Sequence, residues 1–374
     1  MAQAFHLAVA LEGAGWHPAA WREPEARPAD LLTAGYWGDL VAEAERGLLD
    51  FVTIEDSLGP ETDRTDRVRG RLDAVLIASR IASQTRHIGF LPTAVVTHTE
   101  PFHLSKAVAT LDYVSTGRGG LRVRISRDQR DAAHFGRREL LEPLEDLLDE
   151  AADCVEVVRR LWDSWEDDAE IRDVATGRFI DRDKLHYIDF EGRWFSVKGP
   201  SITPRPPQGQ PVVAALAHTT PVYRLAARSA DMVFVTPRDI EQARSIAAEL
   251  RALRTEAGRA DEPLSVFADL VVFLGEDAAD RKARLDETAG EEFVSDARVF
   301  TGTPEQLADE LVALGEAGIT GFRLRPGAIP HDLTAITRGL VPELRRRGLF
   351  RTGYEATTLR GLLGLSRPAN RYAA

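Results

Sequence analysis

Short apolar runs alternate with longer amphipathic stretches along most of the chain. Eight of these runs are apolar or alternate in polarity and are bounded by turn-forming or acidic residues, which predicts β-strands. The predicted strands are residues 5–11, 51–54, 87–91, 121–125, 212–216, 232–235, 265–274 and 321–324. Helical spacing of apolar residues predicts helices at 36–48, 72–83, 102–114, 142–162, 221–229, 239–257, 277–286 and 334–347, with another beginning at Thr303-Pro304.

This order of elements predicts an α/β protein built as a (β/α)8 TIM barrel, because strands and helices alternate with short connections. A doubly wound sheet is the alternative architecture. That fold would be expected to carry a G-x-G-x-x-G turn after its first strand, and Glu12-Gly13-Ala14-Gly15 matches this pattern only in part. In a barrel, the active site lies at the carboxyl ends of the strands.

Two segments depart from the regular alternation. Residues 163–210 are charged, aromatic and irregular, and they end in a proline-rich run that stops any helix. Residues 348–374 form a tail after the last predicted helix. We therefore expect a single barrel domain over residues 1–374, with an insertion after the fourth helix and a C-terminal tail.

Composition excludes several classes of function. The chain has 47 Lys and Arg against 59 Asp and Glu, a net charge of −12, which argues against general binding to nucleic acid or anionic membranes. Its one cysteine, Cys154, cannot form an intramolecular disulfide, and no cysteine or histidine cluster has zinc-ligand spacing. No apolar stretch reaches the roughly 18 residues of a membrane span, and the N-terminus lacks the basic region of a signal peptide. We expect a cytoplasmic protein without a metal.

Residues 120–127, GLRVRISR, place charges on a strand whose two faces should both be buried. Alternation puts Arg122, Arg124 and Ser126 on the face that looks into the barrel. An unpaired buried guanidinium costs roughly several kcal/mol, so each arginine needs an anionic partner. That partner is either a bound phosphate or an internal carboxylate, for which the candidates are Glu12, Glu55 and Asp56.

Several motifs resemble the bacterial-luciferase-like flavin monooxygenases, in particular the group of nitrilotriacetate, dibenzothiophene-sulfone and long-chain alkane monooxygenases. They follow the order of that group over nearly the whole chain. The matching segments are GYW (35–37), DFVTIED (50–56), EPFHL (100–104), TLDYVSTGR (110–118), LWDSWEDD (161–168), GTPEQLADEL (302–311), VPELRRRGLFRTGYE (341–355) and RPANRY (367–372). The resemblance implies a luciferase-like barrel, assembled as a homodimer or tetramer, that takes reduced FMN from a separate NAD(P)H:flavin reductase. It would use O2 to oxygenate a small organic substrate.

The resemblance also implies flavin contacts at four positions. Asp56 and Thr93, which is placed just past the third strand, match an aspartate and a threonine near the flavin ring. Ser126 and Thr219 match serines on the phosphate side. Thr219 is expected to open the helix after the fifth strand, where free N–H groups favour an anion. No catalytic residue is predicted.

Other contacts implied by the resemblance are replaced. A family asparagine becomes Arg122, a phosphate-contacting tyrosine falls on Leu148 and the histidine before it on Leu144. A glycine that lets backbone approach the phosphate becomes Ala217, and Glu12 stands where the family carries smaller or softer residues. The lid after the seventh strand is short, at about residues 275–300, although a reactive flavin needs a dry site.

Three functional hypotheses follow. In the first, the chain is an FMN-dependent monooxygenase in which Arg122, Arg124 or Arg127 replaces the lost phosphate contacts. In the second, it binds flavin weakly or not at all and acts as a structural, regulatory or ligand-binding protein, with its arginines paired internally across the barrel mouth. The third is an F420-dependent oxidoreductase, as in a sister branch of the superfamily, but the C-terminal motifs favour the monooxygenases. The sequence does not predict the substrate.

Overall fold

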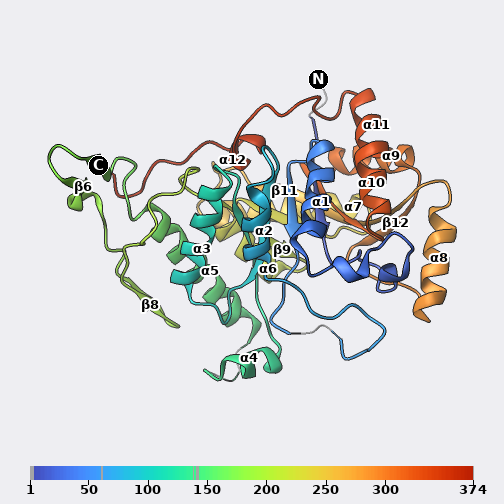
Figure 1. Cartoon of the computed structure of the whole chain (residues 1–374), viewed down its shortest axis with the longest axis horizontal. Coiled ribbons are helices and arrows are strands. Elements are labelled where there is room, and N and C mark those ends of the chain that lie inside the picture. The colour runs from blue at the N-terminus through green and yellow to red at the C-terminus, as the bar shows by residue number, and fades with distance from the viewer. Residues whose placement is uncertain (1–3, 60–61, 138, 140–142, 374) are drawn as a thin grey trace.

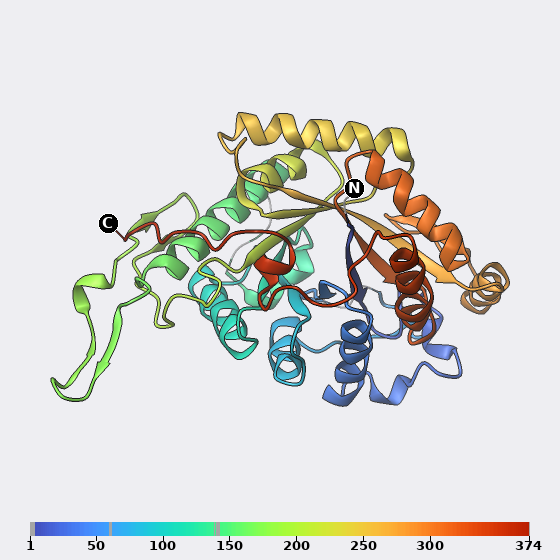
Figure 2. The same cartoon turned by 90° about the horizontal axis from the view of Figure 1, so that it is seen from above.

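A computed structural model describes residues 4–59, 62–137, 139 and 143–373. Parallel strands close into a barrel with helices around it (Figure 1, Figure 2). In order around the ring, the strands are β1 (His6–Leu11), β2 (Phe51–Ile54), β3 (Gly89–Val95), β4 (Gly120–Arg124), β9 (Val212–Ala217), β10 (Met232–Val235), β11 (Ser265–Leu274) and β13 (Gly321–Pro326). Strand β13 pairs with β1 and closes the ring, so the predicted barrel is confirmed and the doubly wound sheet is excluded.

The predicted helices form with small shifts at their ends. They are α1 (Ala34–Arg46), α2 (Ala74–Ala82), α3 (Pro101–Val114), α5 (Leu144–Asp163), α6 (Thr220–Ser229), α7 (Ile240–Glu256), α8 (Ala278–Ala289) and α9 (Pro304–Glu316). The last predicted helix is three consecutive pieces, α10 (His331–Ala335), a π-helical turn (Ile336–Leu340) and α11 (Val341–Arg346). The predicted start of the fourth helix at Glu142 lies outside the described residues.

Local sequence explains where these helices begin and which face they bury. Helix α9 starts with a capping box, since Thr303 accepts from the backbone N–H of Gln306 and the Gln306 side chain bonds back to Thr303. Helix α5 packs against the barrel along an apolar stripe that includes Leu148, Val155 and Trp162. Burial of such stripes, rather than intrinsic helix propensity, supplies most of the stability of helices in proteins.

Several features were not predicted. Helix α4 (Gln129–Phe135) is a short polar helix after β4, and strand β12 (Arg298–Gly302) pairs with the far end of β11. The segment 163–210 is not wholly irregular, because it contains two antiparallel hairpins, β5 (Glu170–Asp173) with β6 (Arg178–Ile180) and β7 (Phe190–Glu191) with β8 (Ser196–Val197). The first hairpin projects from the barrel as an arm (Figure 2).

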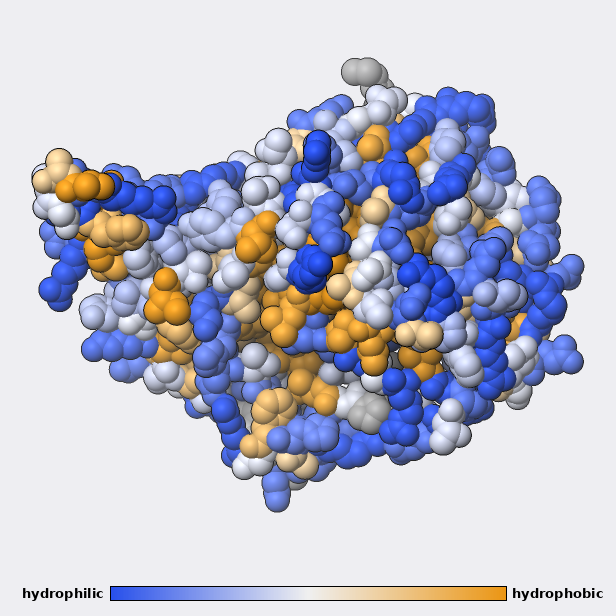
Figure 3. All heavy atoms as spheres, viewed as in Figure 1, coloured by the Kyte–Doolittle hydropathy of each residue, from blue (hydrophilic) through white to orange (hydrophobic). Residues whose placement is uncertain are grey.

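The tip of that arm is partly apolar. Val174 is 95% exposed and Phe179 is 62% exposed, and the hydrophobic side chains stand out at the upper left of the space-filling view (Figure 3). Short 3-10 turns lie at Ala20–Arg22, Pro28–Asp30 and Arg182–Lys184. No helix among the described residues has both the length and the apolar character needed to cross a bilayer.

The barrel interior is apolar at one end and charged at the other. At the amino ends of the strands, Phe51, Leu91 and Phe267 pack with Leu359 and Leu363 from the C-terminal tail. Leu359 begins the short helix α12 (Leu359–Leu362), and its N–H donates to the carbonyl of Gly117, which precedes β4. The tail therefore closes the amino end of the barrel, and the carboxyl end is left for the site.

Candidate active site at the carboxyl ends of the strands

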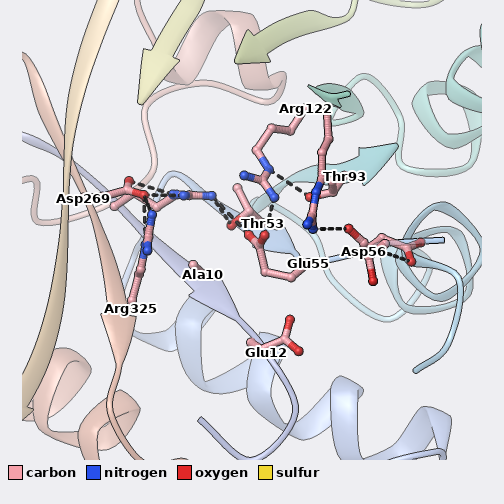
Figure 4. A network of polar contacts seen from close by, with 12 residues as sticks. Ala10, Glu12, Thr53, Glu55, Asp56, Thr93, Arg122, Asp269 and Arg325 are labelled. Atoms are coloured by element: carbon pink, nitrogen blue, oxygen red, sulfur yellow. Dashed lines mark hydrogen bonds and ion pairs between the residues drawn. The ribbon is translucent and has the colours of Figure 1, made fainter. Parts of the chain in front are cut away.

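A buried network of charged side chains fills the barrel interior toward the carboxyl ends of the strands (Figure 4). Arg122 comes from β4, Arg323 and Arg325 from β13, Asp269 from β11, and Glu55 directly follows β2. All five are buried. Strand register places Asp269 beside Arg323, and Asp269 accepts from Nε of Arg323 at 2.8 Å and from Nε of Arg325 at 2.9 Å. Glu55 links Arg122 to the cluster around Asp269, because it pairs both with Arg122 and, at 3.2 Å, with Arg323.

The network is balanced in charge. A third carboxylate, Asp296, lies at the rim and accepts from Arg325 at 2.7 Å. Burial alone would raise the pKa of Glu55 and of Asp269, but the neighbouring guanidinium charges outweigh it and hold both values below their usual range. Burial also acts against ionisation of Asp296, yet its pKa falls to about 2 because of Arg325. Three carboxylates therefore stay ionised opposite three arginines.

Arg122 has internal partners. Its guanidinium pairs with Glu55, and its Nε donates to the hydroxyl of Thr93 at 2.8 Å. Thr93 is not past the third strand as predicted, because β3 continues to Val95 and pairs there with β4, with Thr93 opposite Arg122. Alternation thus placed Arg122 on the inward face correctly, and of the three candidate carboxylates the structure selects Glu55.

The Asp56 carboxylate accepts hydrogen bonds from backbone N–H groups near itself and at the start of α2. Its Oδ2 accepts from the N–H of Ala74 at 2.9 Å, and its Oδ1 accepts from the N–H of Ser57 at 2.8 Å. Burial raises the pKa of this carboxyl. Its main-chain carbonyl accepts from Nη1 of Arg124 at 2.8 Å. The carboxylate is therefore engaged by the amino end of a helix rather than by the arginines of β4.

The two predicted phosphate-side hydroxyls lie apart from the ionic network. Ser126 donates to Asp131 at 2.7 Å and lines a separate cavity of about 450 Å³ with Arg124 and Arg127. Thr219 is exposed at the N-terminus of α6, as expected for the residue that opens this helix. Pro221 follows within the first turn and has no N–H, so the helix offers fewer donors to an anion than usual.

A cavity of about 440 Å³, here called the mouth cavity, opens above the ionic network. One side is charged and the other is apolar. The charged side consists of Glu12, Glu55, Arg122, Arg124, His218, Asp296 and Arg325, and the remaining lining residues are Trp16, Val123, Ile125, Leu148, Ala215, Leu216, Val222 and Leu225. The described lining residues do not include Asp56, Thr93, Ser126 or Thr219. The flavin contacts implied for these four residues therefore remain predictions.

Glu12 lines this cavity and forms an ion pair with Arg71 at 3.4 Å. The glycines that follow Glu12 serve packing: Gly15 has a φ of +128°, and a Cβ there would lie 2.5 Å from the carbonyl oxygen of Gly327. This close approach explains the partial Gly-x-Gly pattern without a phosphate.

Sequence reasoning also missed Trp16 and His218, two residues at the edge of the mouth cavity. Trp16 covers the network, with the guanidinium carbon of Arg325 4.4 Å from its ring centre. His218 lies with Nε2 3.4 Å from Asp296 and Nδ1 2.8 Å from the Thr236 hydroxyl. Partial burial lowers the pKa of His218, which favours the neutral imidazole at the edge of the cavity. The sequence signal for this edge was the pair His218-Thr219 directly after the fifth barrel strand, where site residues are expected.

A second cavity of about 760 Å³, here called the loop cavity, adjoins the first and shares Glu12, Trp16 and Glu55 with it. Its walls include residues from the segments 12–21, 54–59, 62–72 and 291–294. The loop after β2 is tied to the short segment after α8, since Arg64 donates to Glu291 at 3.0 Å. His17 also lines this cavity, but its ring nitrogens are engaged by the Ala19 N–H and by Asp286.

The residues at the mouth fit a flavin ring better than they fit its phosphate. A reduced flavin ring carries negative charge near N1, and the guanidinium groups of Arg122 and Arg325 line the floor where such a ring would rest. For the phosphate, Arg122 is already committed to Glu55, so Arg124 is the cation on the wall that could serve. Leu148, on which the resemblance places a phosphate-contacting tyrosine, adds no polar group.

Comparison with known proteins gives one consistent result. The sequence pattern of the family described as luciferase-like monooxygenase matches residues 14–294. Similar proteins include N-acetyl-S-(2-succino)cysteine monooxygenase of Bacillus subtilis (31% identity) and nitrilotriacetate monooxygenase component A of Aminobacter aminovorans (30% identity), each covering 98% of both chains. The first alignment spans 433 positions against 374 residues here, so the relative has segments that this chain lacks.

Solved structures agree with these relatives. A long-chain alkane monooxygenase superposes with a TM-score of 0.87 at 26% identity, covering 97% of this chain and 96% of its own. Riboflavin lyase, solved with modified FMN and riboflavin, gives a TM-score of 0.88 at 25% identity, covering 99% and 98%. An F420-dependent secondary alcohol dehydrogenase gives 0.67 at 14% identity, which shows a common fold alone.

Proposed function

Because the chain belongs to the luciferase-like monooxygenase family, we propose that it is the oxygenating component of a two-component monooxygenase. It would take reduced FMN from a separate NAD(P)H:flavin reductase and use O2 to oxygenate a small organic substrate. One observation carries the proposal: the ionic network fills the barrel interior but leaves the mouth cavity open above it. Although the arginines are paired internally, the cavity above them still has room for a ligand.

Each group at the mouth has a physical task in this proposal. Reduced FMN, when bound, supplies the reaction with O2. Arg122 and Arg325 hold positive charge under the ring, and their pairing with Glu55 and Asp269 fixes their positions. Trp16 and the apolar residues of α5 and α6 limit the access of water. Nε2 of His218, beside Asp296, is placed to hold or move a proton.

One observation favours the second hypothesis, a relative with weak or no flavin binding. The wall formed by α5 and α6 presents Leu148, Val222 and Leu225 to the cavity, and Pro221 removes a donor from the first turn of α6. Under this hypothesis the protein is a ligand-binding or structural subunit. The two hypotheses differ in what happens to FMN.

Titration of the purified protein with FMN, and anaerobically with chemically reduced FMN, separates them. Saturable binding that Arg124→Ala weakens by about fivefold or more supports the monooxygenase, since one charge-assisted contact to phosphate is lost. Arg127→Ala is the matched control, because Arg127 lines the neighbouring cavity rather than the mouth, and we expect it to bind FMN as the wild type does. Arg122→Ala is expected to lower stability instead, because it leaves Glu55 with fewer partners.

Two results would overturn the proposal. Absence of saturable binding at high micromolar reduced FMN would favour the flavin-free subunit. With a reductase and candidate substrates supplied, return of all consumed O2 as hydrogen peroxide would contradict a monooxygenase even if flavin binds.

A further inference from the structure

The loop cavity contains a cationic group that is only partly used. Arg67 lies in the loop between β2 and α2 and lines this cavity. Its side chain is 8% exposed, and its Nη2 donates to Glu291. Its Nη1 is buried and has no hydrogen-bond partner. A buried donor on a charged group without a partner is rare in folded proteins and calls for an explanation.

Four large aromatic side chains form part of the cavity wall. Trp16, Trp21 and Trp37 line it together with Phe293. The three indole N–H groups are each used by a backbone carbonyl, at 3.1, 3.2 and 2.9 Å respectively, so these side chains offer ring surface to a ligand. Flat apolar surface of this kind suits a planar or aromatic body.

The charges around Arg67 restrict the anion it could meet. Four glutamates line the cavity. Glu12 pairs with Arg71, Glu55 with Arg122, and Glu291 with Arg64. Glu292 adds a further carboxylate at the exposed edge. The same wall carries Arg64, Arg67, Arg69 and Arg71, so four positive charges stand against four negative ones. The unpartnered Nη1 of Arg67 therefore offers one donor position, which suits a single carboxylate.

We infer that the loop cavity binds a small aromatic or planar monocarboxylic acid, with its carboxylate on Nη1 of Arg67 and its ring among the tryptophans. The cavity adjoins the mouth cavity at Trp16 and Glu55, so the bound acid lies next to the proposed flavin position. Only the identification of this acid as the molecule oxygenated rests on the proposed function. Binding itself does not require flavin.

Indole-3-acetate is the probe, and indole-3-acetamide is its neutral counterpart of the same shape. Isothermal titration calorimetry of the full chain without flavin should show the acid binding at least tenfold more tightly than the amide. Arg67→Ala should remove that preference and leave the amide affinity unchanged. The matched control is Arg69→Ala, which deletes a charge from the same loop and the same cavity wall. Arg69 is 44% exposed and pairs with Asp63, so this variant should keep the preference.

A further variant guards against loss of folding. Arg67→Lys keeps the charge and the pair with Glu291 but loses the planar guanidinium edge, so it should retain the wild-type melting temperature and lose most of the preference. Equal affinity for acid and amide overturns the inference, as does absence of acid binding up to millimolar concentration. The inference is also overturned if Arg67→Ala and Arg69→Ala lose the preference for the acid equally, because the preference would then come from the overall positive charge of the loop.

The outcome is separable from that of the proposed function. If acid binding follows Arg67 while FMN fails to bind, the chain is a ligand-binding protein with this site. If FMN binds while the acid does not, the monooxygenase proposal stands and this inference falls.

Discussion

The two sides of the mouth cavity are built on opposite principles. Toward the inner faces of β2, β4, β11 and β13, the cavity is lined by charged groups that are held by neighbours of opposite charge. Toward α5 and α6, Leu148, Val222 and Leu225 present hydrocarbon. Family contacts to the flavin phosphate are expected on the second side, whereas the arginines of this chain lie on the first. Under the proposed function, positive charge is therefore concentrated beneath the flavin ring, and Arg124 is the lining cation left to meet the phosphate.

The charged side should be sensitive to loss of a single acid. Asp269 is the shared partner of Arg323 and Arg325, and both arginines are almost completely buried. Asp269→Ala would leave two buried guanidinium groups poorly paired, and we expect the free energy of unfolding to fall by about 3–5 kcal/mol. Guanidinium chloride denaturation followed by circular dichroism measures this change.

The control for Asp269 lies in the same network. Asp296 also pairs with Arg325, but its side chain is 44% exposed, so Asp296→Ala should cost only about 0–1 kcal/mol. If the two variants lose similar amounts of unfolding free energy, burial is not what makes the loss of an acid costly in this network.

Acid should weaken the same side of the cavity. The neighbouring arginines outweigh burial and lower the pKa of Asp269. Its folded-state pKa therefore lies below the unfolded value, so its contribution is complete above the usual aspartate pKa and is lost as pH falls through the folded value. The stability difference between wild type and Asp269→Asn should stay level from pH 7 to about 4 and shrink below that.

Denaturation curves for both proteins at half-unit pH steps measure this difference. A difference that widens toward low pH would show that Asp269 is not held ionised by its arginines. A difference that already shrinks near pH 6 would do the same.

Sequence patterns were enough for the barrel but not for the pairing inside it. Alternation over residues 120–127 placed Arg122 and Arg124 inward, and a period of two along a strand leaves no other choice once the strand is recognised. Which carboxylate meets Arg122 depends on the register and tilt of β2 against β4, two strands that are not neighbours. Glu12, Glu55 and Asp56 could therefore not be distinguished beforehand.

Other parts of the site had signals that were not used. Asp269 interrupts a ten-residue run that is otherwise mostly apolar, and Arg323 and Arg325 alternate on the last strand as Arg122 and Arg124 do on the fourth. A buried acid between two such arginine pairs indicates an internal network. Arg67 gave no signal, because its burial depends on the contact between its loop and the segment at 289–293, which are far apart in sequence.

The apolar side of the cavity gives the smallest predicted effect and the most direct test of the comparison. Leu148 stands where the resemblance places a phosphate-contacting tyrosine, and it lines the mouth cavity from α5. Leu148→Tyr would return a hydroxyl donor to this wall, and we expect FMN to bind about three- to tenfold more tightly, a gain on the scale of one hydrogen bond. Leu148→Phe adds the same ring without the hydroxyl and should leave the affinity as it is. Riboflavin, which lacks the phosphate, should bind both variants equally. If Leu148→Phe improves FMN binding as much as Leu148→Tyr does, the gain comes from packing on the ring, and the phosphate does not lie on the apolar side at all.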